Sequence, residues 1–340
     1  MNRSAGNKAC RPDQVKKKGP HMITLQENIP LAPFTSFGIG GPARFLVEAG
    51  STEELRDAVR FARQRGVDFY LLGGGTNLLV SDSGFDGLVI RVKFDAVRLA
   101  GKGVEAEAGA DLTGLVRSVA NWGLAGMEPL AGIPGMLGGA IRGNAGAYGS
   151  CIGELCTTVR VLNSKTLEFA ELSREECRFA YRNSRFKRDP GLIVVSAQLA
   201  LSPSASEEIR HRVEATVARR TARKLQCEKS AGSFFMNPVV TDAGLIERFE
   251  ADREVICRDG RVPAGWLIEQ AGLRNQRVGG ARVSSLHANY LINTGGARAE
   301  EIVTLARLVK ERVRAVTGVQ LQEEASFLGF SPAQAPCSSA

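Results

Sequence analysis

The sequence has few of the residues that bind metals and no long apolar run. Only three of its 340 residues are His, and its seven Cys residues form no CxxC pair and have no His at ligand spacing, so a zinc site is excluded. Scattered cysteines, odd in number, are typical of free thiols in a reducing compartment. A transmembrane helix needs about 18 consecutive apolar residues, and no run approaches that length. We therefore expect a cytoplasmic protein without a metal ion or a membrane contact.

Acidic residues are scarce at the start of the chain. Residues 1–21 contain six Lys and Arg side chains against Asp13, a net charge of +5, so the other residues carry only +3 of the formal +8. A basic segment without an apolar core is typical of a solvated arm and not of a secretory signal. We expect a disordered arm over 1–21 and no nucleic-acid partner; an arm that binds nucleic acid is the alternative.

Helix and strand signals alternate irregularly after the arm, which predicts α+β or mixed α/β domains. Ser51 followed by Glu54 is a capping box and Gly66 is a stop signal, so a helix is expected between them. A long charged helix over 206–224 is expected to connect two domains, with the boundary near residue 205. The other expected helices are 111–123, 173–176, 263–270 and 299–316, and the expected strands are 43–47, 68–72, 87–92, 104–108, 159–162, 192–201 and 319–327.

Glycine is abundant, with 38 residues, and many of them form two clusters. The first cluster, residues 73–78, directly follows an expected strand. Consecutive glycines allow positive φ angles and let backbone N–H groups surround a phosphate. The spacing matches neither a Walker A loop nor a Rossmann GxGxxG loop. A phosphate-binding loop and a tight turn without a ligand are equally good interpretations of this segment alone.

The second cluster, residues 132–149, is a long stretch with little regular pattern. A loop of this length inside a domain is usually functional or disordered. The apolar residues Ile133, Leu137, Ile141 and Tyr148 between the glycines argue against disorder. We interpret the cluster as backbone wrapped around a large polar ligand; glycine that only permits tight packing is the alternative.

Several segments together resemble a known family. Residues 40–43, 73–79 and 132–149 resemble the FAD-binding half of the enolpyruvoylglucosamine reductases. The resemblance covers nearly the whole chain beyond the arm, and the short spacing between Arg182 and Ser233 is similar to the shorter, second type of the family. Three later motifs match the same family in order, at 181–187, 231–238 and 321–327.

The resemblance implies a fold and a division of the chain. The implied fold is the FAD-binding fold of the vanillyl-alcohol-oxidase type, with two lobes, followed by a C-terminal α/β substrate domain. The expected parts are the FAD-binding domain at 22–205, the substrate-binding domain at 206–318, a strand at 319–330 that returns to the flavin, and a tail at 331–340. The implied FAD contacts lie in the two glycine clusters: Gly73, Gly74, Gly75, Thr76, Asn77, Leu78, Gly132, Ile133, Pro134, Gly138, Gly139, Asn144, Gly146, Ala147 and Tyr148.

The resemblance also implies a reaction. NADPH reduces FAD, flavin N5 then delivers a hydride to C3 of UDP-N-acetylglucosamine enolpyruvate, and the product is UDP-N-acetylmuramate for peptidoglycan. Arg182 would hold the substrate carboxylate through two hydrogen bonds. Glu324 would donate a hydrogen bond if burial and the anionic substrate raise its pKa, and Ser233 would protonate C2. Tyr181 and Asn237 are candidate substrate contacts, and a monomer is expected.

Other interpretations stay open. Met236 stands where many relatives have a basic residue, which puts one substrate or nucleotide phosphate contact in doubt. An FAD-dependent oxidoreductase of another sugar or alcohol, and a flavin-binding module without turnover, are the alternatives. Neither glycine cluster contains a His for covalent flavin attachment, and all three implied catalytic residues are present, so the reductase is the interpretation we favour. Because side chains alternate along a strand, only one of Glu323 and Glu324 is expected to face the site.

Overall fold

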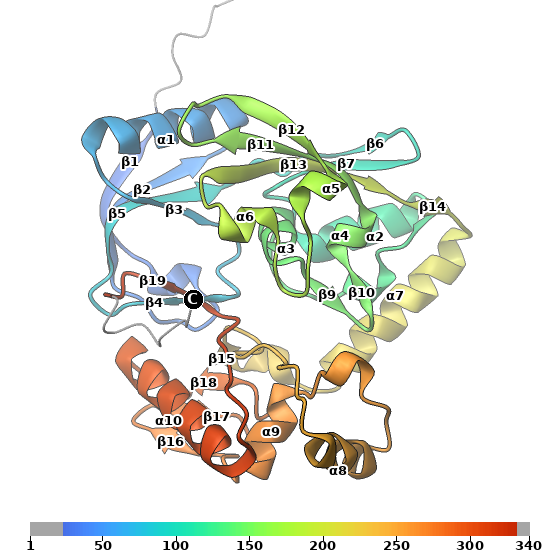
Figure 1. Cartoon of the computed structure of the whole chain (residues 1–340). Helices are drawn as coiled ribbons and strands as arrows, with labels where there is room; N and C mark the ends of the chain where they lie inside the picture. Colours follow the sequence, from blue (N-terminus) through green and yellow to red (C-terminus); the bar gives the residue numbers. More distant parts are fainter. Residues whose placement is uncertain (1–22, 332–340) are drawn as a thin grey trace, which may run out of the picture.

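The computed structural model describes residues 23–331, so the predicted arm and the predicted tail beyond Ser331 lie outside the described residues. Figure 1 shows a larger N-terminal region with two lobes and a smaller C-terminal region below it. The long helix α7 (Ser206–Thr221) runs between the two regions. The mixture of helices and strands in both regions confirms the predicted fold class.

The first lobe is a four-stranded sheet with one covering helix. Ser51 accepts the backbone N–H of Glu54 at the start of this helix, and Gly66 ends it with a φ of 63°. The Glu54 carboxylate accepts the N–H of Gly50, one residue before the position that a capping box predicts. In their order across the sheet the strands are β1 (Leu25–Pro30), β2 (Pro42–Ala49), β5 (Phe85–Val92) and β3 (Phe69–Leu72), and the helix is α1 (Thr52–Arg65).

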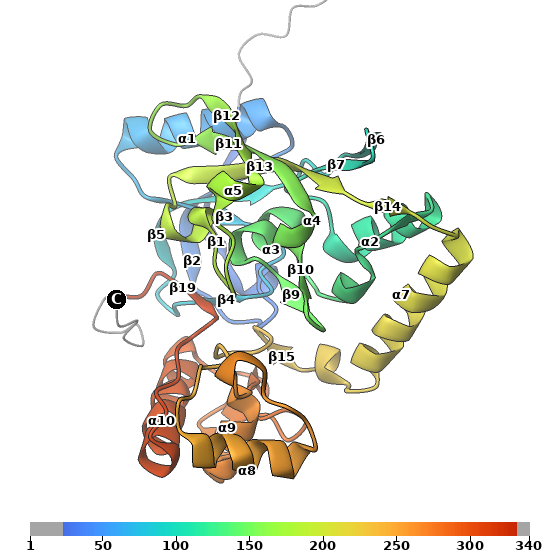
Figure 2. The same cartoon turned by 45° about the vertical axis from the view of Figure 1, so that its right-hand side comes forward.

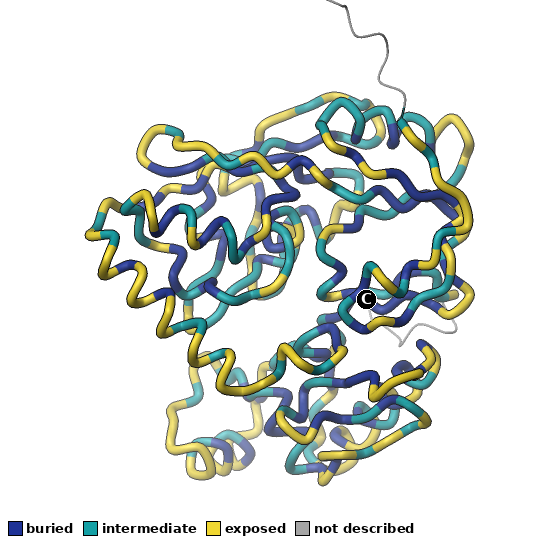
Figure 3. Tube along the Cα trace, turned by 180° about the vertical axis from the view of Figure 1, so that it is seen from behind, coloured by how far each residue is buried: buried dark blue, intermediate teal, exposed yellow. Residues whose placement is uncertain are grey.

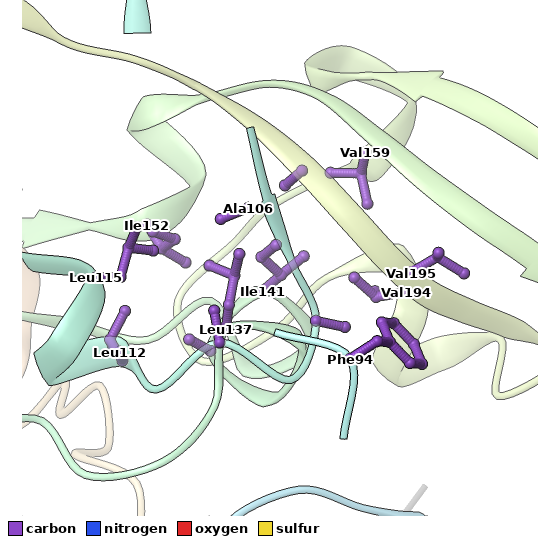
Figure 4. Close-up of a cluster of buried hydrophobic side chains, with 14 of the residues drawn as sticks. Phe94, Ala106, Leu112, Leu115, Leu137, Ile141, Ile152, Val159, Val194 and Val195 are labelled. Carbon is purple, nitrogen blue, oxygen red and sulfur yellow. The ribbon is translucent and has the colours of Figure 1, made fainter. Parts of the chain in front are cut away.

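The second lobe is a five-stranded antiparallel sheet with helices packed against it. It shares one hydrophobic core with the first lobe, since Leu55 of α1 and Val159 of this sheet belong to the same buried cluster. Figure 4 shows Leu137 and Ile141 within this core, close to the strand that carries Ala106. The strands, in sheet order, are β12 (Phe169–Ser173), β11 (Cys156–Asn163), β13 (Leu192–Ala200), β7 (Gly103–Glu107) and β6 (Val97–Ala100), and the helices are α2 (Leu112–Asn121), α3 (Leu137–Gly143) and α4 (Ile152–Leu155).

Part of the second glycine cluster is helical, which corrects the expectation of little regular structure there. Leu137, Ala140 and Ile141 of α3 are buried at the i, i+3 and i+4 spacing of one helix face. Gly138 lets this helix approach the sheet, because a Cβ at that position would lie 2.9 Å from the Cβ of Ala108. Glycine has a low helix propensity, so packing against the sheet, and not local preference, fixes this helix.

Helix α7 belongs to the core of the N-terminal region, which corrects the predicted boundary near residue 205. Its buried residues Ile209 and Val213 lie in the same cluster as the two lobes. Arg212 adds two hydrogen bonds to the Glu128 carboxylate, from Nε at 3.1 Å and Nη2 at 2.9 Å. The i, i+4 stripe seen in the sequence is therefore a packing face on the first region, and the C-terminal core begins only after the helix.

The C-terminal region has its own hydrophobic core. This core contains Ala231, Trp266, Leu291 and Val309, and Figure 3 shows the buried stretches of both regions from behind. Figure 2 shows α8 beneath α9 at the base of this region; the sequence had not predicted α8. The antiparallel sheet has the order β15 (Lys229–Ser230), β18 (Leu291–Asn293), β17 (Ala281–Val283) and β16 (Arg277–Val278), and the helices are α8 (Ala243–Arg253), α9 (Ala264–Gln270) and α10 (Ala299–Thr317).

The last described segment crosses back from the C-terminal region to the first lobe. The expected strand over 319–327 is mostly irregular, and only β19 (Ser326–Leu328) forms a strand, parallel to β4 (Leu78–Val80). Before β19, the N–H of Glu324 donates to the carbonyl of Phe234 at 2.8 Å. One short segment thus contacts both the first glycine cluster and the C-terminal region.

The remaining elements are short. Within residues 23–331 no helix is long and apolar enough to span a bilayer, and no group of three His, Cys, Asp or Glu side chains there could hold a metal ion. The other strands are β8 (Leu124–Ala125), β14 (Ser202–Pro203), β9 (Gly146–Ala147) and β10 (Ser150–Cys151), and the other helices are α5 (Arg174–Cys177), α6 (Arg185–Arg188), η1 (Ala32–Phe34), η2 (Glu128–Leu130), η3 (Leu225–Cys227) and η4 (Arg258–Gly260).

The packing of α7 on the N-terminal core is testable. Ile209→Ala should lower the free energy of unfolding by about 2–5 kcal/mol, because it leaves a cavity at a position that is 1% exposed. Ile256→Ala is the matched control, since Ile256 is 85% exposed and should change stability by less than about 0.5 kcal/mol. Urea unfolding of both variants measures the difference. Equal effects would show that α7 does not pack on this core.

Candidate functional site

The structure brings the two glycine clusters into direct contact. A Cβ on Gly74 would lie 3.1 Å from the Cα of Gly135, so neither backbone has room for a side chain at this point. The Thr76 hydroxyl donates to the carbonyl of Pro134 at 3.2 Å and links the clusters. We call residues 73–77 and 135–139 together the glycine cradle.

The first half of the cradle has the features of an anion site. Within residues 23–331, none of the backbone N–H groups from Gly73 to Asn77 donates a hydrogen bond. Gly75 has a φ of 63°, and a Cβ there would lie 2.0 Å from the carbonyl oxygen of Phe34, so only glycine fits. A row of backbone donors on a glycine-rich turn is a typical phosphate site.

The second half of the cradle offers an open surface. A Cβ on Gly139 would meet nothing within 4 Å, whereas its neighbour Gly138 is closed against Ala108. Gly139 is therefore not needed for packing inside the described chain. Backbone donors beside an open glycine surface suit the pyrophosphate and the flat ring system of FAD.

The other residues predicted to contact FAD lie around the cradle, and several have structural partners. The Asn77 amide donates to the carbonyl of Glu324 at 3.1 Å. Asn144 is buried and donates to the carbonyl of Ala180 at 2.8 Å, while its oxygen accepts the N–H of Gly153 at 3.0 Å. Tyr148 is 48% exposed, with the guanidinium groups of Arg219 and Arg220 close to its ring. Leu78 begins β4, Gly146 and Ala147 form β9, and Gly132, Ile133 and Pro134 precede the cradle.

Arg182 lies in a tight turn that α3 holds in place. Ala180 and Asn183 exchange backbone hydrogen bonds across the turn, and Arg182 has a φ of 52°, which is unusual for a residue other than glycine. Asn144 at the end of α3 bonds the carbonyl of Ala180, and the Ser184 hydroxyl donates to the carbonyl of Arg142 at 2.7 Å. The second glycine cluster therefore also positions Arg182.

Glu324 forms an ion pair with Arg182, with Oε1 at 2.9 Å from Nε and both side chains only 20–25% exposed. Its neighbour Glu323 faces the other way and pairs with the Lys310 ammonium at 2.8 Å. The prediction that one of these two residues faces the site is confirmed. Arg182 and Glu324, which the sequence separates widely, are thus brought together beside the first glycine cluster.

The environment of Glu324 favours its protonated form. Burial raises the pKa of its carboxyl group, and the charges of Arg182 and Lys187 oppose this effect without cancelling it. A second anion close to Arg182 would raise the pKa further, since two carboxylates that share one cation repel each other. The site can therefore keep a carboxyl group ready to take up a proton.

Ser233 lies one residue from the backbone that holds Glu324. The carbonyl of Phe234 accepts the N–H of Glu324, and the N–H of Phe234 donates to the carbonyl of Asn289 at 2.8 Å. The Asn289 side chain bonds both the N–H and the carbonyl of Phe235, at 3.0 and 2.8 Å. Asn289, which is 2% exposed, was quoted in the sequence only as part of a family motif, and its role as an anchor of Ser233 was missed.

The two candidate substrate residues have different surroundings. Tyr181 is 39% exposed, so it is not a core residue, and the Arg261 guanidinium lies 3.9 Å from its ring centre. The Asn237 side-chain oxygen accepts the N–H of Ala264 at 3.0 Å, at the start of α9. Asn237 therefore caps a helix, and a contact between either residue and a substrate stays a prediction.

Comparisons with known proteins agree with this geometry. The model of an FAD binding domain matches residues 43–166, and the model of the C-terminal domain of UDP-N-acetylenolpyruvoylglucosamine reductase matches residues 223–328. The second match begins just after α7 ends, as the hydrophobic cores do.

Relatives match along nearly their whole length. The UDP-N-acetylenolpyruvoylglucosamine reductase of Solibacter usitatus is 37% identical over 312 residues, 90% of this chain and 97% of that protein. The reductase of Carboxydothermus hydrogenoformans is 39% identical over 305 residues, 89% and 93% respectively. The crystal structure of UDP-N-acetylenolpyruvylglucosamine reductase (MurB) from Thermus caldophilus aligns with a TM-score of 0.72 at 33% identity, covering 90% of this chain and 100% of that one. The chain therefore belongs to the UDP-N-acetylenolpyruvoylglucosamine reductase family, whose members are FAD-dependent oxidoreductases of peptidoglycan precursor synthesis.

Proposed function

We propose that this enzyme reduces UDP-N-acetylglucosamine enolpyruvate to UDP-N-acetylmuramate with NADPH as the hydride donor. The observation that carries the proposal is the meeting of Arg182, Glu324 and the Ser233 segment beside the glycine cradle. FAD, when bound, supplies the hydride that it has received from NADPH. The N–H groups of residues 73–77 would hold its pyrophosphate, and the open surface at Gly139 would lie against it.

Arg182 would bind the carboxylate of the enolpyruvyl group. Its guanidinium is always charged and can donate two parallel hydrogen bonds to a carboxylate. When C3 of the substrate receives the hydride, negative charge develops at C2 and spreads into this carboxylate, so the interaction with Arg182 strengthens during the reaction.

Glu324 already occupies part of Arg182, so the substrate carboxylate must share or replace it. Burial has raised the pKa of Glu324, and the arriving anion raises it further, so we propose that Glu324 takes up a proton as the substrate binds. A neutral Glu324 no longer repels the developing enolate and can donate a hydrogen bond to it.

Ser233 would donate the proton to C2. A serine hydroxyl is a weak acid, but a carbanion-like C2 is strongly basic, so the position of the hydroxyl decides its role. The three backbone and side-chain bonds to Asn289 fix the residues that follow Ser233 and support this role. We further propose that the enzyme acts as a monomer in the cytoplasm, where NADPH and nucleotide sugars are made.

A second candidate function keeps the cofactor and changes the substrate. Met236 lacks the positive charge that many relatives have at this position, which favours a substrate without that phosphate contact, such as another sugar or alcohol. The two candidates differ in whether the enolpyruvyl substrate reoxidises the reduced flavin.

The cofactor assignment predicts different effects of two neighbouring substitutions. Gly139→Ala should leave the stability of the apoprotein unchanged or raise it by up to about 1 kcal/mol, because alanine is the better helix former and its Cβ meets no protein atom within 4 Å. It should nevertheless lower the FAD content, since the Cβ would enter the space assigned to FAD. Gly143→Ala is the control, because Gly143 is equally open but was not assigned to FAD. The flavin-to-protein absorbance ratio and urea unfolding of the apoprotein measure the two effects, and full FAD binding by Gly139→Ala would refute this placement.

The reaction is tested by two anaerobic half-reactions. In the wild type, NADPH should bleach the flavin absorbance and UDP-N-acetylglucosamine enolpyruvate should restore it. Ser233→Ala should leave the bleaching unchanged and slow the recovery by roughly 10²–10⁴-fold, the usual contribution of a general acid. Ser202→Ala, an exposed serine in β14, is the matched control. Equal losses in both half-reactions would refute the role of Ser233, and bleaching without recovery in the wild type would favour the second candidate function.

A further inference from the structure

Lys187 is a half-buried cation that the reaction described above does not use. It lies in α6, directly after the turn that carries Arg182. Its ammonium donates to the carbonyl of Arg182 at 3.1 Å. A lysine that is not solvated at the surface needs a reason for its position, because burial disfavours its charged form.

The first part of that reason is the backbone of Arg182. A positive φ in a residue with a side chain persists only where surrounding contacts impose it. Asn144 and Ser184 bond the ends of the turn, whereas Lys187 bonds the peptide of Arg182 itself. Lys187 therefore holds the residue that has the unusual conformation.

The second part is the balance of charge around Glu324. The groups that face Lys187 are Arg142 from α3, Arg182 from the turn and Glu324 from the C-terminal segment. Burial, with Arg142 and Arg182, lowers the pKa of Lys187, and Glu324 opposes this. Arg182 and Lys187 both favour the ionised form of Glu324, and Tyr290 also faces this carboxyl group.

Three cations thus surround one carboxylate, so an ionised Glu324 leaves an excess positive charge in the cluster. The other basic residues of α6 do not belong to this group: Arg188 donates to the carbonyl of Arg178 at 3.0 Å, and Arg185 is close to Cys177. An excess of positive charge suits a site that must receive a second carboxylate whose negative charge increases during the reaction.

We propose that Lys187 is a positioning residue of the reductase, which closes the turn that presents Arg182 and sets the pH at which Glu324 exchanges its proton. This inference rests on the proposed function, because it takes the proton of Glu324 to be required when the substrate is reduced. Activity then falls as the pH rises through the pKa of Glu324 in the substrate complex. Removing the charge of Lys187 raises that pKa and moves the fall to higher pH.

The test compares three variants by the pH profile of flavin reoxidation, with rates expressed per bound FAD. Lys187→Met should move the alkaline fall upward by about one pH unit, the effect of a nearby charge. It should also raise the KM for the enolpyruvyl substrate roughly tenfold, as expected when a charged hydrogen bond that orients Arg182 is lost. Lys187→Arg retains a cation and a donor, and should restore both values toward those of the wild type.

Arg188→Met is the matched control, since it removes a cation that also bonds a backbone carbonyl from the same helix. It should keep the wild-type pH profile. If Lys187→Met is too unstable to purify, Lys187→Gln removes the charge, retains a polar group and should show the same pH shift.

Two failures can be told apart. A wild type whose flavin is not reoxidised by the substrate refutes the proposed function itself. If the wild type turns over but the Lys187→Met or Lys187→Gln enzyme keeps the wild-type pH profile and KM, this inference is wrong, whatever the thermal stability of the variants, because a purely structural lysine would change stability alone.

Discussion

The ion pair between Arg182 and Glu324 is the interaction on which the arrangement of the site depends. The two residues are 142 positions apart in the sequence, by subtraction of their numbers, and the 2.9 Å contact joins the second lobe to the last described segment of the chain. To form it, the chain must build both lobes, cross along α7, complete the C-terminal core and return to the first lobe. A partly buried pair of this kind adds little to stability, so its value lies in placing a guanidinium and a carboxyl group where a second anion can join them.

Several hydrogen bonds fix the two regions around that pair. The Ser36 hydroxyl donates to the carbonyl of Ser230, and the Asn293 amide donates to the carbonyl of Phe37 at 2.9 Å. The Asp82 carboxylate accepts the N–H of Ala299 at the start of α10, where a negative charge is favoured. These bonds all join the first lobe to the C-terminal region, on the side where β19 pairs with β4. The Ser233 segment and the glycine cradle are therefore held in a fixed relation.

Much of this structure could be predicted from local signals. The cap of Ser51, the stop at Gly66 and the period of α10 depend on neighbouring residues alone, and the structure confirms these elements. The resemblance of separated motifs predicted the family and its FAD-binding domain, which the comparisons confirm.

The features that the sequence did not reveal depend on contacts between distant residues. Helix α3 contains three glycines and forms because Gly138 packs against Ala108 of the sheet. The stripe on α7 predicted a buried face but not which region covers it. Asn289 holds the residues after Ser233 across 54 positions of sequence, and no local pattern distinguishes such an anchor from an ordinary turn residue.

The central claim is that the substrate carboxylate joins Glu324 at Arg182 and that Glu324 takes up a proton as it does so. Calorimetric binding of UDP-N-acetylglucosamine enolpyruvate to the oxidised enzyme, in two buffers with different ionisation enthalpies, measures this proton directly. The account predicts an uptake of up to about one proton per chain near neutral pH, and none in Glu324→Gln. Binding without proton uptake in the wild type, or the same uptake in Glu324→Gln, would contradict it.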